Sequence, residues 1–106
     1  KRDALTRMLY VILGHDAPGN LDQRLSLRPQ HRAHIAELQH AGRLVIAGPR
    51  PRVEAIDPGA AGYHGSLIIG EFDDLVAARE WAESDPYFKA GIFSQVDIQP
   101  FVKALP

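Results

Sequence analysis

The chain has 106 residues, of which 45% are apolar, and its 12 basic and 13 acidic side chains give a net charge of −1. This length allows one domain with a single packed core, and the charge balance offers no basic surface for nucleic acid or for a membrane. The chain has no cysteine, which excludes disulfides, cysteine-ligated zinc and thiol catalysis. Its apolar runs are too short to span a bilayer and no signal peptide is visible, so a soluble cytoplasmic protein is expected.

The first predicted element is a strand at residues 8–14, which is apolar on both faces and ends at a glycine. The polar residues 1–7 before it are expected to form a disordered arm, or to be foreign to the single domain of residues 8–106. A polar loop is predicted at 15–27. Loops of that length are more often functional than idle in a compact domain.

A helix is predicted to begin near Pro29, since proline favours the first turn, and to end at Gly42, since glycine favours the C-terminal cap. A strand at 43–49 follows. A turn-rich segment at 50–65 then leads into a third strand at 66–72.

Asp73 or Asp74 is expected to cap a second helix at 75–84, which ends before Pro86. A fourth strand is predicted at 92–101. The resulting order, β-α-β-β-α-β, predicts an α+β fold of the ferredoxin-like type.

The predicted sheet has one face without a cover. Two helices can cover only one side of four strands, yet the strands at 8–13 and 66–69 are apolar on both faces. Because large exposed apolar faces mark interaction surfaces, we expect a homodimer that pairs sheet against sheet.

The topology brings several polar side chains and turn residues to one rim of the sheet, where the first strand ends. These residues are His15, Asp16, Arg28, His31, Gly48, Pro49, Gly62, Gly65, Asp85 and Tyr87.

The three histidines of the first helix separate by angle at about 100° per residue. His31 lies near the inward stripe of Ile35 and Leu38, His34 lies at its edge, and His40 lies on the solvent side. His31 is expected to point inward at the first turn, where the helix N-terminus should keep its ring neutral, which suits a general base.

Each candidate also has a structural interpretation. An inward His31 can be a hydrogen-bonded packing residue, and Asp85 can simply cap a short turn at 86–91. Arg28 can be a surface residue, or a planar donor for a carboxylate or phenolate. His31 and His34 could share a metal, but without further ligands of a recognised pattern this signal is weak. No metal and no cofactor are therefore expected.

Several ordered motifs carry a resemblance to a known family. They are "MLYVIL", "RLSLRPQH", "GRLVIAGP", "DPGAAGYHGSLIIGEF", "AAREWAESDPYFKAGIF" and "IQPF". Together, over about residues 8–102, they resemble the YCII-related, or YciI-like, family. The resemblance implies a dimeric ferredoxin-like fold and a site centred on His31 of the R-P-x-H motif and Asp85 of the D-P-Y motif, with Asp16 at a further family position. It also implies a link to lyase-type steps such as dehydrochlorination, and to muconolactone isomerase by fold.

The sequence departs from the family pattern near the motif histidine. His15 stands beside Asp16 where a neutral polar residue is usual, Arg32 replaces a common leucine, and His34 is unusual. These differences bear on the substrate more than on the fold.

Two functions remain open from the sequence. One is a cofactor-free lyase or isomerase in which His31 moves a proton and Asp85 orients it. The other is a non-catalytic module that binds a small molecule in the same pocket. The residues expected to contact the small molecule are Arg28, Asp16, Tyr87, Gly48 and Pro49.

Overall fold

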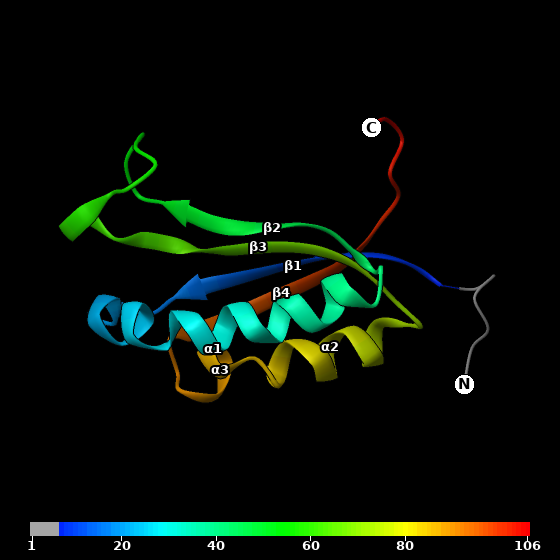
Figure 1. Ribbon diagram of the computed structural model, residues 1–106, viewed down its shortest axis with the longest axis horizontal. Helices are drawn as coiled ribbons and strands as arrows, with labels where there is room; N and C mark the ends of the chain where they lie inside the picture. The colour runs from blue at the N-terminus through cyan, green and yellow to red at the C-terminus, as the bar shows by residue number, and fades with distance from the viewer. Residues whose placement is uncertain (1–6) are drawn as a thin grey trace.

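A computed structural model describes residues 7–106 of the chain as one four-stranded antiparallel sheet with helices packed on one side (Figure 1). Its elements are β1 (Met8–Asp16), α1 (Leu21–His40), β2 (Leu44–Pro51), the short 3₁₀ turn η2 (Gly59–Ala61), β3 (Tyr63–Phe72), α2 (Leu75–Glu83), α3 (Pro86–Lys89) and β4 (Phe93–Phe101). The strand order β2-β3-β1-β4 is the ferredoxin-like arrangement that the sequence predicts.

The predicted N-terminal arm falls mostly outside the described residues. Its last residue, Arg7, donates from Nε to Asp73 at 2.8 Å. Within residues 7–106, none of the helices is long and apolar enough to cross a membrane.

The two central strands, β1 and β3, pair in register, with Val11 opposite Ile69 and Ile12 opposite Ile68. Their contact is close near the end of β1, where a side chain at Gly65 would place its Cβ 1.7 Å from the Gly14 carbonyl oxygen. Only glycine can occupy this position, and its free carbonyl becomes part of the site described below.

The core lies between the sheet and the helices. It is built from alternate residues of the strands and from the small residues of α2; the buried members are Tyr10, Ile12, Leu38, Ile68, Phe72, Ala78, Ala82, Tyr87, Ile92, Phe93 and Val96. Two polar residues on the helices, His31 and Asp85, are also buried beside it, 6% and 1% exposed.

Helix α1 begins at Leu21, so the predicted long loop at 15–27 and the predicted start near Pro29 are both wrong. Pro29 lies inside the helix with its ring exposed. The helix starts after Asn20, whose side-chain amide donates to the Gly91 carbonyl at 3.1 Å and ties the first turn to the segment before β4. The apolar stripe does not reveal these first two turns, because its positions there include the buried Arg24.

The other helix boundaries follow the predicted signals. The Gly42 N–H donates to the Gln39 carbonyl with Gly42 at φ +73°, which ends α1 as expected for a glycine after a helix. Asp74, one of the two predicted caps, accepts from the Ala77 N–H at 2.9 Å at the start of α2. The third strand starts earlier than predicted, at Tyr63, because Pro51 and Tyr63 extend the β2–β3 pairing.

Candidate active site

A buried histidine–carboxylate pair joins α1 to α3. His31 Nδ1 lies 2.8 Å from the Asp85 carboxylate, and the two side chains are only 8% and 2% exposed. A carboxylate only accepts hydrogen bonds, so Nδ1 carries the proton and donates it. The other ring nitrogen, Nε2, is therefore free to accept a proton while the ring is neutral.

Asp85 has both of the roles that the sequence left open. Its side chain accepts from the Tyr87 N–H at 2.9 Å, which makes it the N-cap of α3. The same carboxylate accepts from His31. Because the backbone of α3 holds the carboxylate, the capping bond fixes the direction in which His31 points.

Aromatic rings fix the plane of the His31 imidazole. The ring stacks on Tyr87, with centroids 3.9 Å apart and planes at 9°, and meets the Phe93 ring edge-on at 6.2 Å. Tyr87 is itself locked, because its hydroxyl donates to the Arg24 carbonyl at 2.9 Å. Burial raises the pKa of the Tyr87 phenol against the opposing effect of Arg24, so this hydroxyl keeps its proton at neutral pH.

One predicted reason for a neutral His31 is wrong. The ring does not lie at the helix N-terminus, because α1 begins ten residues earlier, at Leu21. The dipole of the first turn acts only over that turn. The charge nearest to the ring is instead Asp85, which stabilises the imidazolium that a general base forms.

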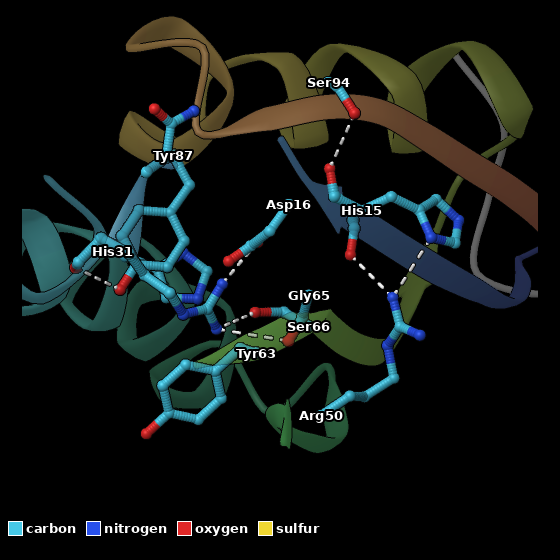
Figure 2. A network of polar contacts seen from close by, with 12 residues as sticks. His15, Asp16, His31, Arg50, Tyr63, Gly65, Ser66, Tyr87 and Ser94 are labelled. Carbon is cyan, nitrogen blue, oxygen red and sulfur yellow. Dashed lines mark hydrogen bonds and ion pairs between the residues drawn. The ribbon is translucent and has the colours of Figure 1, made fainter. Parts of the chain in front are cut away.

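Arg24 is the functional candidate that the sequence analysis missed. It is 2% exposed, and its guanidinium donates to Asp16 at 2.7 Å, to the Ser66 hydroxyl at 2.8 Å and to the Gly65 carbonyl at 3.3 Å. Its Cζ lies 4.7 Å from the Tyr63 ring centroid and 4.8 Å from that of Tyr87. Figure 2 shows this network beside the stacked rings of His31 and Tyr87.

A signal for Arg24 exists in the sequence. Arg24, His31 and Leu38 are spaced by seven residues, and they are the buried residues of α1. An arginine one heptad before an inward histidine lies on the same helix face. A helix predicted to extend from Pro29 toward the N-terminus would include Arg24 on the face of His31.

Asp16 contacts Arg24 and does not line the groove described below. Burial raises the pKa of the Asp16 carboxyl, while the neighbouring Arg24 charge opposes the rise. Its side chain and that of Arg24 are 7% and 3% exposed, so the two form a buried ion pair. Asp16 also borders a small hollow of about 200 Å³ beside Tyr63 and Arg52.

A groove of about 590 Å³ runs between α1 and β2, and His31 lines it. Gly48 and Pro49 form part of its β2 wall and Arg28 part of its α1 wall. Arg28 also donates to the Tyr63 hydroxyl at 3.2 Å. Of the sequence-predicted residues, the groove thus brings Arg28, Gly48, Pro49 and Tyr87 together with His31.

The α1 wall of the groove is strongly basic. Arg24, Arg28 and Arg32 follow each other at intervals of four residues and all line the groove, while none of its lining residues is acidic. Like charges four residues apart destabilise a helix slightly. In a chain of net charge −1, this arrangement concentrates positive potential where a ligand would lie.

His15 and Asp16 are adjacent in the sequence but make separate contacts, with Asp97 and Arg24 respectively. His15 Nε2 contacts Asp97 at 2.8 Å, and Nδ1 contacts Arg50 at 3.3 Å. An arginine only donates, so Nδ1 accepts and Nε2 carries the proton toward Asp97. Hydrogen bonds from Gln95 and then from His15 lower the pKa of the Asp97 carboxyl.

The remaining histidines of α1 have separate surroundings. His34 Nε2 donates to the Trp81 carbonyl at 2.8 Å and its ring stacks on Trp81, which joins α1 to α2. His40 is exposed, as predicted. Among residues 7–106, no group of three histidine, aspartate or glutamate side chains has the geometry of a metal site.

Comparison with known proteins decides the family. The model of the YCII-related domain matches residues 8–102. The chain belongs to the YCII-related family. This YCII-related chain is 50% identical over 96 residues to protein YciI of Escherichia coli, covering 91% of this chain and 98% of that protein. It is 44% identical over the same length to a Haemophilus influenzae protein.

Solved structures similar to this YCII-related chain include one enzyme with a bound ligand. It is 5-chloro-2-hydroxyhydroquinone dehydrochlorinase of Burkholderia phenoliruptrix in complex with 2,5-dihydroxybenzoquinone, at 26% identity and a TM-score of 0.80. The match covers 90% of this chain and 94% of the dehydrochlorinase. A Pseudomonas aeruginosa structure, at 15% identity and a TM-score of 0.52, shares the fold.

Proposed function

We propose that the protein is a cofactor-free enzyme of the lyase or isomerase type, in which His31 moves a proton on a small carbonyl-containing or phenolic metabolite. The observation that carries the proposal is the His31–Asp85 pair, buried at 2.8 Å beside an arginine-lined groove. A neutral imidazole with one nitrogen held by a carboxylate and the other free is the arrangement of a general base.

In the proposed step, His31 Nε2 takes a proton from a carbon next to a carbonyl group. Asp85 orients the ring through Nδ1 and stabilises the positive charge that forms on it. Tyr87 acts by position, since its ring stacks on the imidazole and its hydroxyl is already bonded to the Arg24 carbonyl.

The basic wall supports a substrate that carries negative charge. Neither Arg28 nor Arg32 is paired with a carboxylate in the described part of the chain, and both line the groove. A guanidinium presents a planar pair of donors that fits a carboxylate or phenolate. Gly48 and Pro49 are small residues in the opposite wall of the groove, so the substrate can pack closely against that wall. Asp16 contributes to the site indirectly, because it accepts a hydrogen bond from the Arg24 guanidinium.

The similarity to the dehydrochlorinase supports the same type of chemistry. That enzyme is a dehydrochlorinase of 5-chloro-2-hydroxyhydroquinone, and its structure holds 2,5-dihydroxybenzoquinone. The first molecule is a phenol and the second combines acidic hydroxyls with carbonyl groups, which suits a base beside arginines. The similarity supports the reaction type and leaves the substrate of this chain to experiment.

The proposal is tested by hydrogen–deuterium exchange. A panel of small carbonyl compounds and phenols, including 2,5-dihydroxybenzoquinone, is incubated in D₂O with the wild type, His31→Ala and His40→Ala. We expect the wild type and His40→Ala to label at least one compound at carbon, and His31→Ala to lose this activity. Compounds that bind without any His31-dependent exchange would instead indicate the non-catalytic binding module.

We also propose that the protein is a homodimer through the uncovered face of the sheet. Tyr10 and Ile12 of β1 point to the core, so the alternate residues Leu9, Val11 and Leu13 point to the other face. On the neighbouring strands, Val11 lies opposite Ile69, Leu13 opposite Leu67 and Leu9 opposite the partly exposed Phe101. These partners extend the apolar surface.

Sedimentation at micromolar concentration tests the assembly. We expect a dimer for the wild type and a monomer for Val11→Glu, which places a charge in the centre of that surface. A wild-type monomer at this concentration would remove the proposal.

A further inference from the structure

Two buried hydrogen-bond donors on residues that line the groove have no acceptor within residues 7–106. Arg24 Nε is buried without a partner in the described part of the chain. The Ser66 hydroxyl is 2% exposed and accepts from the Arg24 guanidinium, so its own hydrogen remains to be donated. Native structures pair nearly all buried donors, and each exception calls for a physical reason.

Both donors belong to residues that line the groove. Arg24, Ser66 and His31 all line the same groove, and the Tyr87 ring contacts both the imidazole and the Arg24 guanidinium. Another buried unpartnered guanidinium nitrogen, Arg50 Nε, belongs to a residue that does not line this groove. The unpaired donors therefore belong to residues that share the groove with His31, the group proposed to remove a proton.

Arg24 is held in place before any ligand arrives. Asp16, the Gly65 carbonyl and Ser66 take three of its contacts, and two tyrosine rings lie against its plane. Asp16 balances the charge of the guanidinium without occupying Nε. Donors that are already fixed need no reorganisation when negative charge develops, which is how an oxyanion hole acts.

We infer that Arg24 Nε–H and the Ser66 hydroxyl form an oxyanion subsite, which binds the oxygen of an enolate or a phenolate. This inference rests on the proposed function of His31. When Nε2 of His31 removes the proton from carbon, the electrons of the C–H bond form a C=C bond, and the electrons of the carbonyl π bond move to its oxygen. The oxygen becomes an anion and accepts from Arg24 and Ser66, while the proton resides on His31.

The subsite is tested by calorimetric binding of 2,5-dihydroxybenzoquinone, which presents an acidic hydroxyl next to a carbonyl. Four variants are compared with the wild type: Ser66→Ala, Arg24→Lys, His31→Ala and the control Ser94→Ala. Ser66→Ala removes one donor and leaves the Gly65 carbonyl to hold the guanidinium, so it is the variant expected to fold normally. Ser94 is an exposed serine on β4 outside the groove.

We expect Ser66→Ala to bind about tenfold more weakly and Arg24→Lys at least as weakly, with Ser94→Ala unchanged. His31→Ala is titrated alongside, because it removes the base while Arg24 and Ser66 stay in place. Wild-type affinity in Ser66→Ala and Arg24→Lys would overturn the subsite, as would a wild-type Kd above about 1 mM. The exchange assay on His31→Ala tests the base, and the affinities of Ser66→Ala and Arg24→Lys test the subsite, so each proposal can fail without the other.

Discussion

Two histidine–carboxylate pairs of this protein have the same length and different surroundings. His31–Asp85 and His15–Asp97 both measure 2.8 Å. The first pair is 8% and 2% exposed, and the second is 37% and 44% exposed. Exposed pairs contribute little, because water and salt screen them. Distance alone therefore does not identify a reactive pair, and burial with fixed neighbours does.

The neighbours of the two pairs also give the rings opposite tautomers. His31 carries its proton on Nδ1, toward Asp85, which leaves Nε2 free. His15 accepts from Arg50 at Nδ1, so both of its nitrogens are engaged. A base needs a free nitrogen, and this difference points to His31.

The largest expected effect comes from removing each ring. His31→Ala should lower proton-exchange activity by about 10²- to 10⁴-fold, the usual contribution of a general base. His15→Ala should leave it within about threefold. Rate measurements on a labelled compound, with circular dichroism as a check of folding, compare the two. Equal losses would show that the two pairs do not differ in function.

The carboxylates provide the next comparison. Asp85→Asn keeps the shape and offers an amide N–H to Nδ1, which favours the wrong tautomer and should lower activity by about 10³-fold. As a pure helix cap, asparagine would replace aspartate well. Retained activity in Asp85→Asn, with a stability equal to the wild type, would return Asp85 to the role of a cap. Asp97→Asn is the matched control and should be nearly silent.

A third comparison concerns stability. Asp16→Asn leaves the buried Arg24 without its counter-charge, but it also removes the cost of burying a carboxylate, which is the cost that raises the pKa of Asp16. The free energy of unfolding should therefore fall, by less than the roughly 3 kcal/mol expected for a fully uncompensated buried charge. Asp97→Asn, in the exposed pair, should unfold at nearly the wild-type denaturant midpoint. Urea unfolding of both variants tests whether the buried Asp16 contributes more to stability than the exposed Asp97. An Asp16→Asn variant as stable as the wild type would mean that Arg24 is held by its other contacts.

The smallest expected effect is the pH dependence of the exposed pair. Hydrogen bonds lower the pKa of Asp97 in the folded protein, so its contribution to stability is present above the unfolded pKa and is lost as the pH falls through the folded value. Asp16 has a raised pKa, so its protonation favours the folded state over that acidic range. The acid-induced fall in Tm should therefore be shallower in Asp97→Asn than in the wild type. An equal slope would show that the Asp97 contacts are too weak to matter.

The sequence predicts the fold well because periodicity and turn residues report local backbone preferences. The strand order, the end of α1 at Gly42 and the cap Asp74 all follow from such signals. The start of α1 does not, since proline favours a first turn and yet Pro29 lies inside the helix. A proline tolerated within a helix cannot be distinguished from a starting proline by local rules.

The His31–Asp85 pair was predictable, because the topology of the fold brings these two residues together. Arg24 was not predicted, because its role depends on hydrogen bonds to other polar residues. His31 and Asp85 meet because α1 and α3 lie side by side (Figure 1). Arg24 was missed because the start of the helix was misplaced, and its partners Gly65 and Ser66 come from a strand 41 and 42 residues away. A buried charge among apolar positions is recognised only when its counter-charge, here Asp16, is known to be near.

The central claim is that Asp85 holds the His31 ring with Nδ1 protonated and Nε2 free. Nitrogen NMR of the histidine rings measures this tautomer directly in the wild type and in Asp85→Asn. The account predicts a protonated Nδ1 and a bare Nε2 in the neutral wild-type ring, with the proton moved to Nε2 in the variant. A wild-type ring protonated on Nε2, or the same tautomer in the two proteins, would contradict it.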